Sequence, residues 1–600
     1  MAIWGRGTLI ALAGAAVLAA AIAVSTDRLA PPPSADVARG SEDAFFASGL
    51  CERELPPGGK PLRWTHAQAL ASFRNLPASR GVLSVELLGH RSAVRVLVGG
   101  SVLGTVASGA RSAAWPVVVR GSRLDVGLDV EPFRAGDGRL LGTQLRRVTF
   151  TPSERRSLPP VSLVLLFVLP AMALVLSARI SGCSPAVSLA LASTSVGLTG
   201  WLLTHCGVVR SAYGAQVALT LVICGAVGAL LAGFVARRAV KAGPWAFAAA
   251  LAAGYVHLVL APSSLMVASD VVLQAHMLER VARGDLFPTS VTQHAVPFRI
   301  PYGVSFFALL APLQHLGLDA VSLVRWGAGI SGFLAALALF IMLAPRSPQL
   351  AAGSVIALQA LPGTFLPYSQ GNLPNVFGQA LTTLFFAWWA GSAPGGWVVG
   401  AVLFALAGLG HLSAAIVLAF LAACFAVIGR ADAREARWRR GVALVVGAGA
   451  VALYYGAFTR LIASQVPRLL EGAGQGAGHG TAAAFVTLLR GEGWKQPWLG
   501  VPALLLALLG WRALNDDRLA RAVKAFVLAG AALMLAALIS PVEVRYLYAL
   551  TTPVAILAAA GFGSLWTRGL AARGLAVTLA GLQVALASTC WVDRLLFHYR

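Results

Sequence analysis

The sequence predicts a polytopic α-helical membrane protein that carries a β-sandwich domain near its N-terminus. Three observations predict this fold class. Hydrophobic residues make up 57% of the 600 residues and charged residues only 12%, whereas a soluble globular domain has about 25% charged residues. Many apolar runs reach about 18 residues or more, which is enough to cross a hydrocarbon core of about 30 Å. Residues 26–157 interrupt this pattern with a polar segment rich in β-branched residues.

The N-terminal region combines a hydrophobic stretch with an exported domain. The apolar run from Leu9 to Val24 follows Arg6, so residues 1–25 form either a cleaved signal peptide or an N-terminal transmembrane helix that acts as a signal anchor. Both alternatives export the chain that follows. Residues 26–157 carry many charges and contain no run long enough to span a membrane, which predicts an extracytoplasmic domain.

Six short segments predict the fold of residues 26–157. They lie at 81–88, 93–98, 101–106, 115–119, 123–130 and 144–150, and glycine or polar turns separate them. Short alternating strands with such turns are typical of a β-sandwich, here a jelly-roll-like one. Such a domain binds carbohydrate or serves as a spacer, and the fold alone does not decide between the two.

Residues 158–592 are predicted to form a polytopic membrane domain, followed by a short C-terminal tail at 593–600. Candidate spans lie near 160–178, 185–205, 213–236, 245–262, 321–343, 350–366, 377–392, 396–410, 411–429, 441–463, 499–512, 522–541, 545–563 and 571–590. Together with the N-terminal helix they amount to about 14–16 transmembrane helices.

The net charge of +23, from 47 Lys and Arg against 24 Asp and Glu, is interpreted as a topology signal and not as a sign of a nucleic-acid partner. Many arginines lie in short loops between apolar runs, and cytoplasmic loops are enriched in positive charge. Four basic loops lie at 237–241, 430–440, 512–521 and 568–573. If the N-terminus is inside and residues 300–316 do not cross, these four basic loops are cytoplasmic, and loops 263–300, 367–376 and 464–498 face outside. If residues 300–316 do cross, a later span must be re-entrant. The expected location is a bacterial inner (cytoplasmic) membrane, with the active site and the N-terminal domain facing the periplasm or the exterior.

Titratable side chains are concentrated in the outer loop 263–300, where charge is costly unless a site uses it. Residues 270–283 contain no proline or glycine and predict a short helix ended by Gly284. Asp270 is either a helix-start residue favoured by the helix dipole or a carboxylate at the mouth of a cavity that acts as base or metal ligand. The candidates in this region are Asp270 as catalytic residue and, for substrate binding, His276, Glu279, His294, Arg299 and Tyr302.

A second outer segment, residues 367–375, is uncharged but rich in amide and hydroxyl groups. These groups hydrogen-bond sugar hydroxyls well, although Gly, Asn and Pro are also ordinary turn residues. His411 lies between two apolar runs, where a buried structural histidine is the default interpretation. Farther along, Arg545 is placed either to bind a phosphate or to pair with Glu543. The substrate-binding candidates of these regions are Gln370, Asn372, Asn375, His411, Glu543, Arg545 and Tyr546.

Short motifs in this order resemble a known family. The outer loop has Asp270, His276 and the run Gly284-Asp285-Leu286-Phe287-Pro288, and Pro301-Tyr302-Gly303 opens an apolar segment. Leu361-Pro362, Tyr368, Gly371-Asn372, Pro374-Asn375, Phe377-Gly378-Gln379, Gly410-His411-Leu412-Ser413 and Arg545-Tyr546 follow. In layout, residues 155–565 resemble the GT-C superfamily of polytopic glycosyltransferases. They look most like the bacterial branch of membrane proteins named as related to 6-pyruvoyl-tetrahydropterin synthase, a label that does not imply pterin chemistry.

The resemblance implies a catalytic residue and a donor class. GT-C enzymes usually take the sugar from a polyprenyl-phosphate carrier, and an acidic residue of the first large outer loop acts as base or metal ligand, a role that falls here on Asp270. A second acid often follows the first, whereas Val271 follows Asp270 in this chain. This departure weighs against a metal-dependent mechanism; if a divalent cation (Mg²⁺ or Mn²⁺) is used, Asp270 is its ligand.

We therefore expect an integral membrane glycosyltransferase that works within the lipid bilayer. It would move a sugar from a polyprenyl-phosphate-linked donor to an extracytoplasmic acceptor, which is a cell-envelope glycan, a lipid or a protein. Asp270 would deprotonate the acceptor hydroxyl, while cationic side chains offset charge on the leaving phosphate. The alternatives are a transporter or flippase of a lipid-linked or polar solute, and a non-catalytic membrane assembly protein. The sequence shows no convincing repeat between its halves, which argues against transport.

Overall fold

The computed structural model describes residues 5–29, 34–36, 47–54, 62–76, 78–89, 92–119, 121–135, 140–155, 158–205, 214–236, 242–262, 270–291, 299–391, 396–428, 434–465, 499–514, 518–536 and 548–592. The chain divides into two compact units. Among the described residues, the first unit comprises those up to residue 229 and the second those from residue 230 onward.

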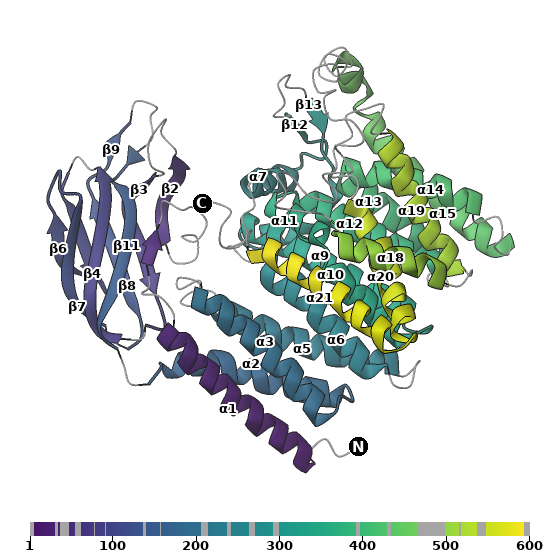
Figure 1. Ribbon diagram of the computed structural model, residues 1–600. Helices are drawn as coiled ribbons and strands as arrows, with labels where there is room; N and C mark the ends of the chain where they lie inside the picture. The colour runs from purple at the N-terminus through teal and green to yellow at the C-terminus, as the bar shows by residue number, and fades with distance from the viewer. Residues whose placement is uncertain are drawn as a thin grey trace. The chain divides into compact units, whose positions relative to one another are not determined.

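The first unit contains a sheet of nine strands, visible in Figure 1. In chain order they are β1 (Ser34–Asp36), β2 (Ala47–Glu54), β3 (Leu62–Phe73), β4 (Ala78–Gly89), β5 (Val94–Val98), β6 (Ser101–Val106), β7 (Ser112–Val118), β8 (Leu124–Val130) and β11 (Gln144–Arg155). The sheet order is β6-β5-β8-β3-β11-β4-β7, with β1 paired to β11 and β2 to β3. A separate antiparallel pair is formed by β9 (Phe133–Arg134) and β10 (Leu140–Leu141).

This sheet curls until its two edges approach each other. On β6, Gly104 faces the indole ring of Trp115 on β7 so closely that a Cβ at this glycine would overlap the ring nitrogen. Register shifts between β11 and β4 mark bulges, which bend and twist a strand pair. The prediction of a β domain is confirmed, but the jelly-roll-like sandwich of two facing sheets is corrected to one sheet that is nearly a barrel. Its inner face is apolar, as the alternating burial along β8 shows.

An ionic hydrogen-bond cluster on this sheet predicts a pH-dependent stability. Burial raises the pKa of Asp125, but hydrogen bonds from Arg123 and Ser72 and the positive charges of Arg123 and Arg74 outweigh it, so the pKa lies below its ordinary value of 3.8. The folded state therefore gains stability that is complete above the pKa of the unfolded chain and is lost as the pH falls through the folded pKa. We expect Asp125→Asn to speed amide exchange of β8 relative to the native chain at pH 7, and this difference to shrink below about pH 4.

The control for this prediction is Glu131→Gln, which removes an exposed carboxylate just after the same strand. Both variants and the native chain are compared at equal pH, so that the intrinsic pH dependence of exchange cancels. A difference between Asp125→Asn and the native chain that is as large at pH 3 as at pH 7 would contradict the assignment.

Three helices of the first unit pack along one another: α1 (Arg6–Leu29), α2 (Val161–Ile180) and α3 (Pro185–His205) (Figure 1). A further helix, α5 (Gly214–Ala236), begins in this unit and continues into the second. The buried face of α1 repeats a small residue at every fourth position, namely Ala11, Ala15, Ala19 and Ala23. Small residues let helices approach closely, which allows α1 to pack against α2 and α3.

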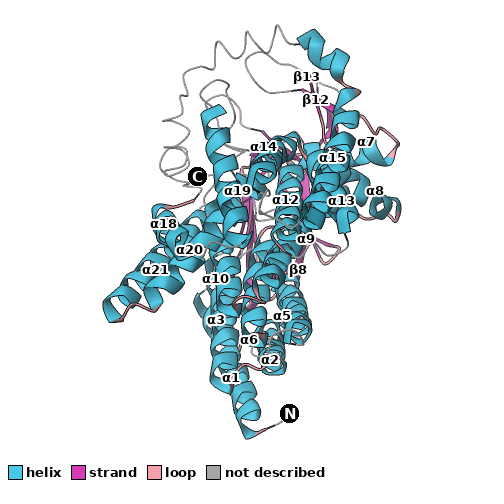
Figure 2. Ribbon diagram, turned by 90° about the vertical axis from the view of Figure 1, so that its right-hand side faces the viewer, coloured by secondary structure: helices cyan, strands magenta, loops and turns pink. Residues whose placement is uncertain are grey.

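The second unit is helical. Its helices are α6 (Gly243–Gly254), the π-helix η2 (Tyr255–Leu260), α7 (Val271–Ala282), α8 (Ser305–His315), α9 (Ala320–Leu343), α10 (Pro348–Gln359), the 3₁₀ turn η3 (Pro362–Thr364), α11 (Leu366–Ser369), α12 (Leu373–Ala390), α13 (Gly396–Gly410), α14 (Leu412–Ile428), α15 (Arg434–Gly456), α18 (Val501–Ala513), α19 (Arg518–Ala536), α20 (Thr551–Trp566) and α21 (Leu570–Val592). A hairpin of β12 (Thr289–Val291) and β13 (Arg299–Pro301) lies at the end of the unit near α7, as Figure 2 shows. Within this unit, α12 packs against α9 and α13, and α10 packs against α6, α9 and α20.

Seven helical segments among the described residues are long and apolar enough to cross a membrane: Arg6–Leu29, Val161–Ile180, Val217–Phe234, Gly243–Leu260, Ala320–Leu343, Tyr548–Trp566 and Leu570–Trp591. An eighth candidate combines Arg437–Gly456 with Thr459–Gln465 across a bend of 61°. The described part of the chain thus falls short of the expected 14–16 spans. Helix length accounts for part of this difference, because the apolar helices α13, α14 and α18 have fewer than 18 residues.

Two predicted segments differ from single spans. The run 350–366 does not form one helix, since α10 ends at Gln359 and is followed by a 3₁₀ turn that begins at Pro362, where proline cannot continue a helix. Residues 300–316 contain α8, which has 11 residues and is therefore about 17 Å long. This is too short for a hydrocarbon core of about 30 Å.

Candidate functional site

Asp270 stands at the start of α7. It occupies the N-cap position of the helix, but its side chain makes no capping hydrogen bond, and the residue is half-buried. Helix N-termini favour negative charge, so this is a suitable place for a carboxylate whose oxygens are not used by the helix itself. The helix predicted over residues 270–283 is confirmed, with Gly284 at a positive φ of 97° after its end.

The structure brings Asp270 against the amide-rich segment, 101 residues later in the chain. The backbone of Gly371 approaches so closely that a Cβ at this position would lie 2.5 Å from the amide nitrogen of Asp270 and 2.9 Å from its Cα. Gly371 also has a backbone φ of +69°, a value that residues other than glycine rarely adopt. Glycine is thus required twice at this position, and the two predicted site segments meet there.

Residues 367–376 are more deeply buried than the outer loop that the sequence predicts. They comprise the end of α11, the turn at Gly371 and the first turn of α12, and only Gln370 among them is not buried. Gln370 accepts a hydrogen bond from the hydroxyl of Tyr548 at 3.0 Å. This contact joins the segment to the residues directly before α20.

Two buried asparagines of this segment hold unsatisfied donors. Asn372 and Asn375 are 5% and 0% exposed, and the side-chain nitrogen of each makes no hydrogen bond within the described part of the chain. The side-chain oxygen of Asn375 accepts from the hydroxyl of Ser413 at 2.8 Å and from Gln379 at 3.0 Å. Buried polar groups without partners are rare and need an explanation; here they lie in the segment that contacts Asp270.

His411 belongs to the same cluster. Its Nδ1 lies 2.7 Å from the hydroxyl of Ser413 and accepts a hydrogen bond from the backbone of Ser413 at 3.2 Å. Since Ser413 also bonds to Asn375, the predicted residues His411 and Asn375 are linked through one serine. The default interpretation of His411 as a structural histidine agrees with its backbone contact at the start of α14.

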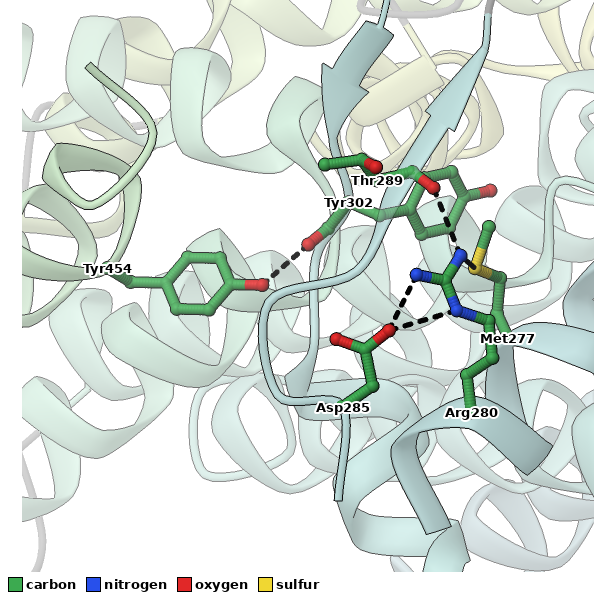
Figure 3. A network of polar contacts seen from close by, with 6 residues as sticks. All are labelled: Met277, Arg280, Asp285, Thr289, Tyr302 and Tyr454. Carbon is green, nitrogen blue, oxygen red and sulfur yellow. Dashed lines mark hydrogen bonds and ion pairs between the residues drawn. The ribbon is translucent and has the colours of Figure 1, made fainter. Parts of the chain in front are cut away.

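Tyr302 belongs to the network drawn in Figure 3. Its hydroxyl bonds to the side chain of Gln274 at 2.9 Å, and its backbone carbonyl accepts from the hydroxyl of Tyr454 at 2.7 Å. Gln274 is buried, whereas His276 is exposed and Glu279 pairs with Arg283 at 3.3 Å. The helix therefore turns Gln274 toward Tyr302 and separates it from the two predicted substrate-binding residues on its outer face.

The turn after α7 is held by an ion pair, also visible in Figure 3. The guanidinium of Arg280 donates to Asp285 at 2.6 and 2.9 Å and to the carbonyl oxygen of Thr289 at 3.3 Å. Asp285 therefore has a structural role in this turn. This contact ties the end of α7 to the β12–β13 hairpin.

The backbone of Arg299 forms two hydrogen bonds to the side chain of Gln465. Its amide nitrogen donates to the side-chain oxygen of Gln465 at 2.5 Å, and its carbonyl accepts from the side-chain nitrogen of Gln465 at 3.0 Å. The guanidinium is not part of this pairing, and the residue is exposed. The remaining predicted residues, His294, Glu543, Arg545 and Tyr546, lie outside the described residues.

Several residues of the site were not among the predicted ones. Three of them, Gly371, Gln274 and Ser413, lie within segments or motifs identified from the sequence. Their contacts could not be predicted from the sequence. Tyr454 and Gln465 lie 152 and 166 residues from their partners, and no local pattern points to them. Within the described ranges, no group of three or more His, Cys, Asp or Glu side chains is arranged to hold a metal ion.

Comparisons of the sequence with protein-family models and with curated proteins find no match.

Proposed function

We propose that the chain is an integral membrane glycosyltransferase that transfers a sugar from a polyprenyl-phosphate-linked donor to an extracytoplasmic acceptor. The observation that carries the proposal is the position of Asp270. Asp270 is a half-buried carboxylate residue at the start of α7, and its backbone lies against a buried segment in which two side-chain amide nitrogens make no hydrogen bond to any described residue. A base beside groups that hydrogen-bond oxygen-rich ligands is the arrangement that sugar transfer requires.

The proposed reaction is a displacement at the anomeric carbon. The hydroxyl proton of the acceptor passes to the carboxylate of Asp270, and the acceptor oxygen forms a bond to that carbon. The bond between this carbon and the phosphate oxygen breaks, and the phosphate leaves with the electron pair. The side-chain nitrogens of Asn372 and Asn375, which make no hydrogen bond to any described residue, would donate to sugar or phosphate oxygens.

The membrane part of the proposal rests on the apolar helices and the basic loops. Seven described helices have spanning length and hydropathy, and α8 is too short to cross. The four basic loops are placed on the cytoplasmic side, because cytoplasmic loops are enriched in positive charge. We therefore propose a bacterial inner membrane location, with the β domain and Asp270 on the outer side.

The test is to replace Asp270 by Asn and to measure sugar transfer from polyprenyl-phosphate donors in membranes. Loss of a general base typically lowers the rate by about 10²–10⁴-fold, and we expect a loss in this range at normal expression. A matched control is Asp319→Asn. Asp319 caps α9 by accepting from the amide of Ser322 at 2.8 Å, and Asn caps a helix about as well, so transfer should be unchanged. Unchanged turnover of Asp270→Asn would remove the proposed base.

A further inference from the structure

A buried histidine that the proposed reaction does not use lies in an unusual helical turn. His257 is 3% exposed and belongs to the π-helix η2, which continues α6 within one of the segments of spanning length. Single π-helical turns inside α-helices are rare and are frequent at functional sites. A histidine placed in such a turn is therefore a candidate for a specific role.

The hydrogen bonds of Tyr368 define the state of this histidine. The hydroxyl of Tyr368 donates its one proton to the carbonyl oxygen of Ala328 at 3.1 Å. Nδ1 of His257 lies 3.0 Å from the same hydroxyl oxygen, so Nδ1 must carry the proton and donate to Tyr368. Nε2 makes no hydrogen bond to any residue that the structure describes.

Two glycines on α9 make room for this pair. A Cβ at Gly332 would lie 2.5 Å from Nδ1 of His257 and 2.8 Å from the hydroxyl of Tyr368. A Cβ at Gly329 would overlap the carbonyl oxygen of His257. The imidazole and the phenol therefore lie against the backbone of α9. The hydrogen bond between them joins η2 to α11, and the bond from the Tyr368 hydroxyl to Ala328 joins α11 to α9.

The element that this bond holds is the one that contacts Asp270. Tyr368 lies in α11, three residues before Gly371, whose backbone touches Asp270. We propose that His257 is a positioning residue, which holds α11 through the Nδ1–Tyr368 hydrogen bond and thereby places the Gly371 turn against Asp270. The effect on turnover rests on the proposed function, whereas the effect on α11 does not.

Two variants of His257 distinguish the role of Nδ1 from that of Nε2. Asn places its amide nitrogen near the position of Nδ1, and Gln places it near that of Nε2. We expect His257→Asn to keep amide exchange of residues 366–372 within about threefold of the native chain, and His257→Gln and Tyr368→Phe to raise it about tenfold or more, because a buried hydrogen bond is lost. Transfer should follow the same order, with a lower kcat and an unchanged KM for the donor. His315→Gln, at an exposed position, controls for the substitution itself.

The exchange measurement needs no substrate, so it distinguishes failure of this proposal from failure of the proposed function. If His257→Gln leaves exchange of residues 366–372 at the native level, or if His257→Asn loosens them as much as His257→Gln, the positioning role is wrong. A loss of transfer in His257→Asn alone would assign the role to Nε2 and would also overturn it. Unchanged transfer in Asp270→Asn, with the expected exchange pattern, would overturn only the glycosyltransferase.

Discussion

Gly561→Ala is expected to lower the thermal stability of the protein strongly, although it adds a single methyl group. Helices α18 and α20 cross at Gly510 and Gly561. A Cβ at Gly561 would overlap the carbonyl oxygen of Leu506 and lie 3.0 Å from the amide nitrogen of Gly510, and a Cβ at Gly510 would meet Leu557 and Gly561 in the same way. These neighbours are backbone atoms that cannot rotate away, so the two helices must separate.

Separation of α18 and α20 affects more than one contact. Overpacking costs about 1–3 kcal/mol where side chains can adjust, and we expect at least the upper end of this range where only backbone can move. α20 also packs against α10 and α21, so the change spreads through the second unit. The measurement is thermal unfolding of the purified protein in detergent.

Gly563→Ala is the matched control on the same helix. A Cβ at Gly563 meets nothing within 4 Å, and Ala is favoured over Gly inside a helix by about 1 kcal/mol. We expect this variant to be as stable as the native chain or slightly more so. Equal unfolding temperatures for the two variants would show that α18 and α20 do not approach as closely as the structure indicates.

The sequence allowed prediction of those features that depend on local pattern. The apolar run 321–343 predicts α9 (Ala320–Leu343) almost to the residue, because a long apolar run bounded by polar residues leaves few alternatives. The helix at 270–283 and its end at Gly284 follow from the residue types in the same way. Strands β1 to β3 were missed, since residues 34–73 lack the clear alternation of the later strands.

The features that could not be predicted depend on distant parts of the chain. The segment 367–376 has the composition of a loop, but the neighbouring helices bury it, and burial is a tertiary property. Arg299 was predicted for its charge, whereas its backbone pairs with Gln465, 166 residues away. The meeting of Asp270 with Gly371 is of the same kind: both segments were identified, but only the fold shows that they touch.

That meeting makes Gly371→Ala the substitution with the largest expected effect on turnover outside the carboxylate itself. Ala at this position is strained by the φ of +69°, and its Cβ would press on the amide nitrogen and Cα of Asp270. Displacement of a catalytic group by about 1 Å costs on the order of 10²-fold in rate. We therefore expect a loss of sugar transfer of about this size, together with faster amide exchange at residues 270–274.

Gly317→Ala distinguishes the two effects of Gly371→Ala, which are backbone strain at a positive φ and contact of the new Cβ with Asp270. Gly317 has a φ of +85°, so Ala is strained there as well, but a Cβ would meet nothing within 4 Å. A left-handed conformation costs about 1–2 kcal/mol for a residue other than glycine, and both variants should lose stability by this amount. Only Gly371→Ala should lose transfer, because of these two positions only Gly371 places the new methyl group against Asp270, the proposed base. If both variants lose transfer equally, strain explains the loss and the contact with Asp270 does not; if Gly371→Ala keeps full transfer, Asp270 is not the base.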